Sequence, residues 1–217
     1  MDVLYYIGGG SMHNNNELRY SLRSLQKHCR DLGKVWVVGN KPDFLQNVEY
    51  VWLEDKDGWW KNAFNKTMKA IESGISDKFL LMNDDFYMLA DFKAETYPVY
   101  YRGEIPQKAD NPYQEVIINT ARLLKAMDKP TKHYGIHCPI VIEAEKYQTL
   151  AKYMVEPVSV RCLYGNLFCK GQNADDCKGN ILKKNKTKCF SSTPWAPDVM
   201  AELAKMFPER SRFEKEE

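Results

Sequence analysis

Short apolar runs alternate with amphipathic segments along the first part of the chain. Residues 3–7 are apolar and aromatic and are followed by glycines, which predicts a buried strand. The segment 17–29 carries leucines at helical spacing, and Asn16 precedes it as the expected N-cap. Residues 34–39 and 48–52 have the composition of two further strands. A strand, a helix and a strand in succession predict a mainly parallel sheet.

The next pair of elements leads to the most informative motif. A helix is expected over residues 61–74, and the run 78–82 is the most hydrophobic strand of the chain. This strand ends directly in Asn83, Asp84 and Asp85. Open α/β sheets bind ligands outside the carboxyl ends of their strands, so the position of this motif indicates a binding site.

Beyond residue 95 the pattern is less regular. The expected elements are a strand at 97–101, helices at 113–127, 143–154 and 197–206, an exposed lysine-rich loop at 171–188, and a charged tail from Arg212 that frays. With 217 residues and 44% hydrophobic composition, the chain is expected to form one domain, 1–217. We assign nucleotide binding to its first half, 1–95, and acceptor binding to its second half, 96–217.

Charge and cysteine content narrow the class of protein. Lysine and arginine total 31 against 29 acidic residues, so the net charge of +2 does not by itself indicate nucleic acid or an anionic membrane. The N-terminus lacks the basic region and long apolar run of a secretory signal, and no segment is long and apolar enough to span a membrane. We therefore expect a cytoplasmic protein. Its six cysteines are expected to be reduced thiols, since their spacing is a poor match to a zinc site.

Two adjacent carboxylates after a buried strand require a compensating partner, because desolvating an acid is costly. A divalent cation supplies that compensation, and Mg²⁺ or Mn²⁺ prefers carboxylate, water and phosphate oxygens. Asp85 is the first choice as metal ligand and Asp84 the second. The alternative is that one of them caps a turn or the next helix.

A family resemblance strengthens the first interpretation. Residues 15–25, the strand 35–39 and the motif 82–86 resemble the core of Stealth-type sugar-phosphate transferases, and related nucleotide-binding cores occur in GT-A glycosyltransferases and in short phage-encoded proteins. The resemblance covers residues 14–86, and the second half matches only loosely, through residues 137–139. The first strand lacks the aromatic-aspartate pair usual in Stealth proteins. The resemblance implies an α/β, GT-A-like fold with a mainly parallel central sheet flanked by helices, a nucleotide-sugar donor and, for a phage-encoded protein, a location in the host cytoplasm.

The helix that starts near residue 17 is a candidate phosphate site. Arg19 and Arg23 are one turn apart, near a helix N-terminus where backbone N–H groups favour anions. The alternative is local pairing of these charges on a solvated helix face. Glu17 fits two roles equally well, a general base or a capping residue at the helix start.

A second set of candidates lies on the helix that precedes the strand 78–82. Lys61, Asn65 and Lys66 lie near the start of their helix, where they can reach the same cleft and neutralise phosphate charge. Trp59 and Trp60 either stack on a base or sugar ring or cover the edge of the core.

Three further residues come from the second half. His137 is expected at an element boundary, as a metal ligand or general base, with a hydrogen-bonded structural histidine as the alternative. Arg161 and Asn166 are weaker candidates for phosphate or acceptor binding, with a surface strand as the alternative.

The glycines after the first strand are the last candidates. Gly8 and Gly9 allow close approach of the backbone to a nucleotide. Their spacing fits neither a dinucleotide-binding fingerprint nor a P-loop.

The sequence therefore predicts a metal-dependent glycosyltransferase that moves a sugar from a nucleotide sugar to a hydroxyl on a polymer, either a polysaccharide or a modified DNA base. Two alternatives remain open: transfer of a sugar 1-phosphate, and a non-catalytic sugar- or nucleic-acid-binding protein. The lysines at 183, 184, 186 and 188 offer some support for nucleic acid.

Overall fold

A computed structural model describes residues 1–9, 11, 13–179, 186–192 and 197–216. The lysines at 183 and 184, two of the four considered for nucleic-acid contact, lie outside the described residues. In the described part, no helix has the length and apolar character needed to cross a membrane. All six cysteines are free thiols.

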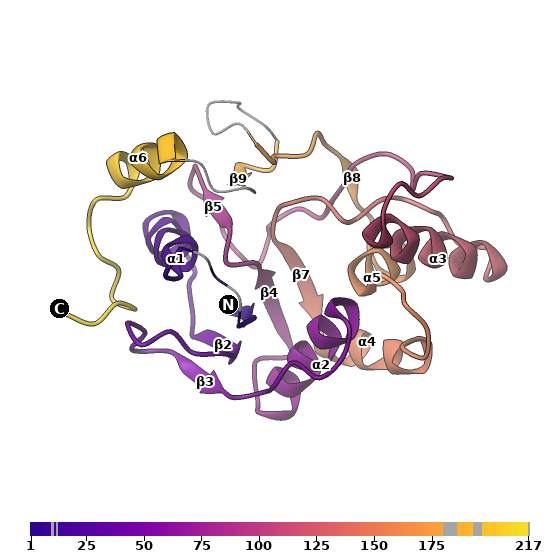
Figure 1. Cartoon of the computed structure of the whole chain (residues 1–217), viewed down its shortest axis with the longest axis horizontal. Helices are drawn as coiled ribbons and strands as arrows, with labels where there is room; N and C mark the ends of the chain where they lie inside the picture. The colour runs from indigo at the N-terminus through magenta and orange to yellow at the C-terminus, as the bar shows by residue number, and fades with distance from the viewer. Residues whose placement is uncertain (10, 12, 180–185, 193–196, 217) are drawn as a thin grey trace.

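A five-stranded sheet forms the centre of the molecule (Figure 1). Its strand order is β3 (Glu49–Val51), β2 (Val35–Gly39), β1 (Asp2–Ile7), β4 (Lys78–Met82) and β7 (Ile140–Glu143). The first four strands are parallel, and β7 pairs antiparallel with β4. The α/β fold with a mainly parallel sheet is thus confirmed, and the predicted strands of the first half are all present.

Helices cover both faces of this sheet, which explains why its strands are apolar throughout. Helix α1 (Asn16–His28) packs with alternate strand residues such as Tyr5 on one face. On the other face, residues such as Leu4 pack with α2 (Trp59–Glu72), α3 (Pro112–Ala126), α4 (Ala144–Gln148) and α5 (Val160–Phe168). Figure 1 shows α1 on one side of the sheet and α2 on the other.

The connections of β1 and β4 determine where a ligand can bind. The chain leaves β1 through α1 on one face and enters β4 through α2 on the other, so the strand order reverses between these two neighbours. Such a reversal separates the loops at the carboxyl ends of the strands and opens a crevice there. The ends of β1 and β4 at this crevice are Ile7 and Met82, where the predicted glycine and Asn-Asp-Asp motifs begin.

Some predicted boundaries were wrong. Asn15, not Asn16, is the N-cap of α1, and it adopts a left-handed conformation with φ 55°. The predicted strand 97–101 is reduced to β6 (Tyr100–Tyr101), which pairs with β8 (Gln172–Asn173). The predicted helix 143–154 divides into α4 and the 3-10 helix η1 (Thr149–Tyr153).

A separate two-stranded sheet lies next to the acidic motif. β5 (Phe86–Met88) continues from the Asn-Asp-Asp motif and pairs with β9 (Cys189–Ser191). The final helix α6 (Pro197–Met206) has the predicted bounds. The short strand pair β5–β9 therefore brings residues near 190 beside the end of β4.

The C-terminal tail is docked, contrary to prediction. Phe213 and Glu214 are 1% and 3% exposed. The Glu214 carboxylate accepts hydrogen bonds from Arg23 Nε at 2.8 Å and Nη2 at 2.7 Å, and from the backbone N–H of Ser211 at 2.8 Å. A buried carboxylate with several donors holds this segment against α1, which explains why it does not fray.

Candidate functional site

The predicted Asn-Asp-Asp motif lies at the carboxyl end of β4, as expected from the sequence. The Asn83 Oδ1 atom accepts a hydrogen bond from the Tyr6 hydroxyl of β1 at 3.0 Å. The Asp85 Oδ2 atom accepts one from the Ser191 hydroxyl of β9 at 2.7 Å. Asn83 and Asp85 are thus held by β1 and β9, and all three residues of the motif are half-buried.

Asp84 occupies an environment that opposes its ionisation. Burial raises the pKa of Asp84 to about 7, and the charges of Asp85 and Glu17 add to the shift, while backbone amides of the Asp84–Asp85 turn oppose it. The Oε2 atom of Glu17, at the start of α1, is buried and has no hydrogen-bond partner among the described residues. A hard divalent cation would relieve the repulsion that Asp85 and Glu17 exert on Asp84. The amide bonds of the turn also agree with the capping alternative.

The protein residues do not enclose a metal by themselves. In the described part of the chain, no group of three histidine, cysteine or acidic side chains is arranged to hold a metal ion. The three predicted ligands Asp84, Asp85 and His137 therefore do not converge on one point. A cation at the aspartates would need ligands from a bound substrate to complete its shell, as Mg²⁺ commonly does with phosphate oxygens.

The ends of β1 and β2 form the neighbouring part of the crevice. Gly8 and Gly9 are exposed, and a Cβ on Gly9 would lie 2.5 Å from the Asn40 amide nitrogen. Lys66 of α2 is buried, donates to the carbonyl of Ile7 at 2.8 Å and pairs with Asp55 at 2.7 Å. The predicted lysine thus reaches the crevice, where Asp55 already balances its charge.

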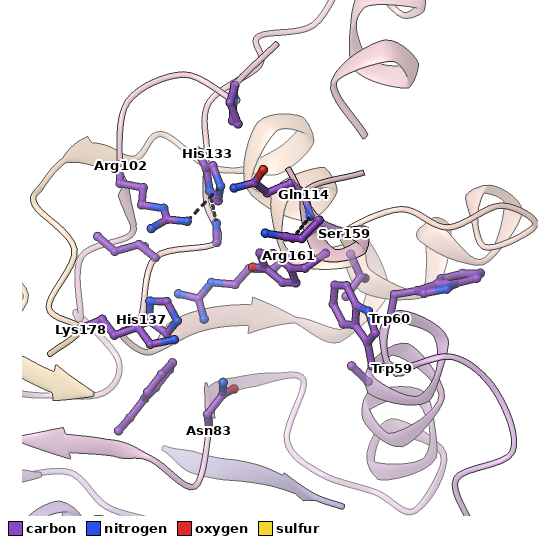
Figure 2. A pocket seen from close by; sticks show the side chains of 18 of the residues that line it. Trp59, Trp60, Asn83, Arg102, Gln114, His133, His137, Ser159, Arg161 and Lys178 are labelled. Carbon is purple, nitrogen blue, oxygen red and sulfur yellow. Dashed lines mark hydrogen bonds between the residues drawn. The ribbon is translucent and has the colours of Figure 1, made fainter. Parts of the chain in front are cut away.

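A pocket of about 740 Å³ opens beside Asn83. Figure 2 shows it between α2, the segment 133–137 and the start of α5. Of the predicted site residues, Asn83, His137 and Arg161 line it, as do both candidate tryptophans, Trp59 and Trp60, whereas Asp84 and Asp85 do not. The pocket therefore meets the acidic motif only through Asn83.

A network centred on Asp176 holds one side of this pocket. Both Asp176 carboxylate oxygens lie 2.9 Å from His137 Nδ1, and Oδ2 also pairs with Arg102 Nη1 at 2.7 Å. Hydrogen bonds and the charges of His137 and Arg102 outweigh burial and hold the pKa of Asp176 well below its usual range. Because the carboxylate accepts a hydrogen bond from Nδ1–H, Nε2 of His137 is the ring atom that remains to accept a proton or bind a ligand.

His133 lies next to this network and stays neutral near pH 7. Arg102 Nη2 is 3.3 Å from its Nε2 atom, and burial, aided by the Arg102 charge, lowers the pKa of His133 to about 4. His133 also lines the pocket. The pocket thus contains two histidines in different electrostatic settings: His137 contacts the Asp176 carboxylate, whereas His133 faces the Arg102 guanidinium.

Arg161 and Asn166 both belong to α5 but have different environments. Arg161 donates from Nε to the carbonyl of Tyr134 at 2.7 Å and from Nη2 to the carbonyl of Cys138 at 2.5 Å. Asn166 is buried and bonds the backbone of Lys132 and Cys162. Asn166 therefore connects α5 to Lys132 by hydrogen bonds. The alternative of a surface strand in this region was wrong, because the segment is helical.

The other predicted binding residues lie outside the pocket. Arg19 and Arg23 pair with Glu214 of the tail. Lys61 and Asn65 both contact Asp57, at 3.3 and 3.2 Å, where they organise the start of α2. Arg19 and Arg23 therefore pair not with neighbours on a solvated helix face but with a buried glutamate far along the chain.

Several pocket residues were not anticipated from the sequence. The missed lining residues are Tyr6, Arg102, Tyr113, Gln114, His133, Ser159 and Lys178. Asp176 does not line the pocket and was missed as the partner of His137. Asp176 lies in a segment that was predicted to be an exposed polar loop, and it is 39 residues from its partner His137. The only available signal was that Asp176 follows another aspartate, which is too common a pattern to identify a site.

Comparison with known proteins identifies the fold. No family model matches the chain, and no curated protein matches it in sequence. The solved structure of the galactosyltransferase LgtC in complex with donor and acceptor sugar analogues is similar, with a TM-score of 0.52, 10% identity and coverage of 98% of each chain. An active-site mutant of LgtC matches at a TM-score of 0.50, also with 10% identity and 98% coverage of both chains. The chain therefore has a GT-A-type fold, over its whole length rather than over the first half alone.

Proposed function

We propose that this protein transfers a sugar from a nucleotide-sugar donor to a hydroxyl group of an acceptor. One observation carries the proposal. The acidic motif at the switch point of the sheet adjoins, through Asn83, a pocket that contains a histidine oriented by a carboxylate. The GT-A-type fold, shared with LgtC at low identity, is compatible with this assignment.

The donor fits along the carboxyl ends of the strands. The exposed backbone at Gly8 and Gly9 allows close approach of a nucleotide at the end of β1. Its diphosphate then lies at Asp84 and Asp85, one strand away, and the sugar extends past Asn83 into the pocket. This placement puts the bond to be broken between the two parts of the site.

Asp84 and Asp85 are the residues proposed to hold Mn²⁺ or Mg²⁺, with Glu17 near enough to add its charge. When bound, such a cation stabilises the negative charge of a departing diphosphate. His137 is not counted among these ligands, because among the described residues no three histidine, cysteine or acidic side chains are arranged to hold a metal ion.

His137 is proposed as the general base. The Asp176 carboxylate accepts a hydrogen bond from Nδ1–H, which leaves Nε2 to accept the proton of the acceptor hydroxyl. The acceptor oxygen forms a bond to the anomeric carbon, the bond from that carbon to the diphosphate oxygen breaks, and a nucleoside diphosphate leaves with the bonding electrons. The acceptor, a polysaccharide or a modified DNA base, would enter through the second-half side of the pocket.

Identification of the released nucleotide tests this proposal. The protein is incubated with a panel of nucleotide sugars, with Mn²⁺ and candidate acceptors, and the products are resolved by chromatography. A nucleoside diphosphate supports sugar transfer, whereas a nucleoside monophosphate means that a sugar 1-phosphate is moved, as in the Stealth-type enzymes. Binding without turnover of any donor contradicts an enzymatic role.

A further inference from the structure

We propose that the pocket beside Asn83 selects an anionic sugar as the acceptor. This inference rests on the proposed function and names its substrate class. Among the described residues that line the pocket, Arg102, Arg161 and Lys178 are cationic and none is an aspartate or glutamate. A lining with one sign of charge favours a ligand of the opposite sign.

Arg161 provides the strongest evidence. The contacts of its guanidinium are backbone carbonyls of Tyr134 and Cys138, and no described carboxylate forms a salt bridge with it. Carbonyl oxygens satisfy its N–H donors and fix its orientation but do not cancel its charge. Figure 2 shows this side chain extending toward His137. The positive charge of Arg161 is therefore available to a ligand that reaches the proposed base.

Lys178 and Arg102 differ in how far their charges are balanced. Arg102 forms an ion pair with Asp176. The same carboxylate also contacts His137, so it is shared between two side chains. Lys178 is exposed and lines the same pocket as His137. The unbalanced charge of the pocket therefore comes from Arg161 and Lys178.

The opposite side of the pocket is aromatic. Trp59 and Trp60 begin α2, and Tyr113 begins α3. Trp59 stacks on Tyr113 with ring centroids 5.1 Å apart and an interplanar angle of 29°. Aromatic rings offer a flat apolar surface to the C–H face of a sugar ring. A ligand that is complementary to both the cationic side and the aromatic side of the pocket carries an acidic group and a sugar ring.

The position of the cations assigns this ligand to the acceptor rather than the donor. Arg161 and Lys178 line the same pocket as His137, which is proposed to take the acceptor proton, while the donor diphosphate is placed at Asp84 and Asp85 outside the pocket lining. A volume of about 740 Å³ is within the range of roughly 300 to 1,000 Å³ typical of small-molecule sites. The acidic group is a carboxylate or a phosphate, which share the chemistry that arginine recognises.

Binding measured without donor tests the inference separately from turnover. The probes are three matched disaccharides, terminated by glucose, glucuronic acid or glucose 6-phosphate, titrated by calorimetry at low salt. We expect one or both anionic probes to bind about tenfold more tightly than the neutral one, as a charge-assisted hydrogen bond would give. The two anionic arms distinguish a carboxylate from a phosphate. Equal affinity for all three probes would overturn the inference.

Two variants and a control locate the effect. Lys178 is exposed, so Lys178→Gln should fold normally. Arg161→Gln removes the guanidinium charge that no described carboxylate balances. Both should reduce the preference for the anionic probe while leaving neutral binding within about twofold, whereas Lys129→Gln, an exposed lysine outside the pocket, should change neither. If Lys178→Gln retains the full preference and Arg161→Gln folds but also retains it, the assignment is wrong.

Competition distinguishes the donor from the acceptor. If a nucleoside diphosphate displaces the anionic disaccharide and loses affinity equally in Lys178→Gln, these cations belong to the donor site and the inference fails. Loss of sugar transfer in all assays, with the anionic preference intact, would instead contradict the proposed function and leave the pocket assignment standing.

Discussion

Asp176 holds Nδ1 of His137 within 2.9 Å of both of its carboxylate oxygens, although the two residues are 39 positions apart. The same carboxylate also pairs with Arg102. This contact determines the orientation of the imidazole and the tautomer it presents to the pocket. If Asp176 positions His137, its replacement should reduce catalysis and not only stability.

Replacement of Asp176 should separate orientation from folding. Asp176→Asn keeps the size of the side chain but removes the charge that favours the reactive tautomer, so we expect kcat to fall by about 10²-fold or more, with the KM of the donor little changed. The pH–rate profile should shift as well, because the imidazole loses its anionic partner. The matched control is Glu104→Gln, which removes the exposed partner of Lys132. An unaltered rate and pH profile in Asp176→Asn would exclude a positioning role.

The acidic motif should be essential for transfer but not for folding. Asp84→Asn combined with Asp85→Asn removes the proposed cation ligands, and we expect a loss of at least about 10²-fold in kcat that added Mn²⁺ does not restore. Asp77→Asn is the control, since Asp77 is exposed and lies just before β4, at the opposite edge of the sheet. Transfer at the wild-type rate by the double variant would refute the proposed mechanism.

Protons and the cation should compete at Asp84. Its pKa of about 7 in the fold lies above the ordinary 3.8, so the metal-free folded state retains a proton that the unfolded chain has lost. The stabilising contribution of this carboxyl is complete below the ordinary pKa and is lost as the pH rises through about 7. Asp84→Asn should flatten this part of the stability profile.

Metal binding has the opposite pH dependence, because the bound carboxyl must be ionised. Thermal unfolding with and without Mn²⁺ should show a larger stabilisation at pH 8 than at pH 6. The difference should vanish in the variant that carries both Asp84→Asn and Asp85→Asn. A shift in Tm from Mn²⁺ that is the same at both pH values would contradict cation binding at Asp84.

The tail contact should affect stability rather than chemistry. Glu214→Gln leaves the Arg23 guanidinium without its carboxylate, and we expect the free energy of unfolding to fall by about 2–4 kcal/mol, as for removal of one partner of a largely buried pair. Hydrogen bonds and Arg23 lower the pKa of Glu214, so its contribution is present at neutral pH and is lost as acidification protonates it. Denaturant titrations at pH 7 and pH 4 measure both effects.

Activity per folded molecule provides the contrast for the tail contact. Glu214→Gln should retain the wild-type KM for the donor below the temperature at which it unfolds. Lys205→Gln, which removes one half of an exposed ion pair with Glu202, serves as a control for stability. An increase in the donor KM without loss of stability would instead indicate that Arg19 and Arg23 bind the donor.

Local sequence patterns predicted the elements that position the site. The segment 78–82 is a strand whose apolar residues 79–82 are all buried, because the sheet is covered on both faces. Its termination by Asn83, Asp84 and Asp85 placed the acidic motif correctly at the carboxyl edge. The start of α1 was displaced by one residue because Asn15 adopts a left-handed conformation that its sequence neighbours do not reveal.

Charged side chains were less predictable than strands. Arg19 and Arg23 were expected to face phosphate, yet they contact Glu214, 191 positions from Arg23. A helical pattern indicates which side of the helix a charge occupies but not which distant segment covers that side. The same limitation concealed the contact between Arg102 and Asp176.

The sequence by itself determined the order of strands and helices, the mainly parallel sheet and the edge at which the acids emerge, since these depend on local hydrophobic periodicity and strand ends. Tertiary structure decided which polar groups meet: His137 with Asp176, Arg161 with two carbonyls, and Arg23 with the tail. Such pairings join segments far apart in the chain. Each polar group satisfies its hydrogen bonds with whichever partner the folded backbone brings near, and no local pattern specifies that partner.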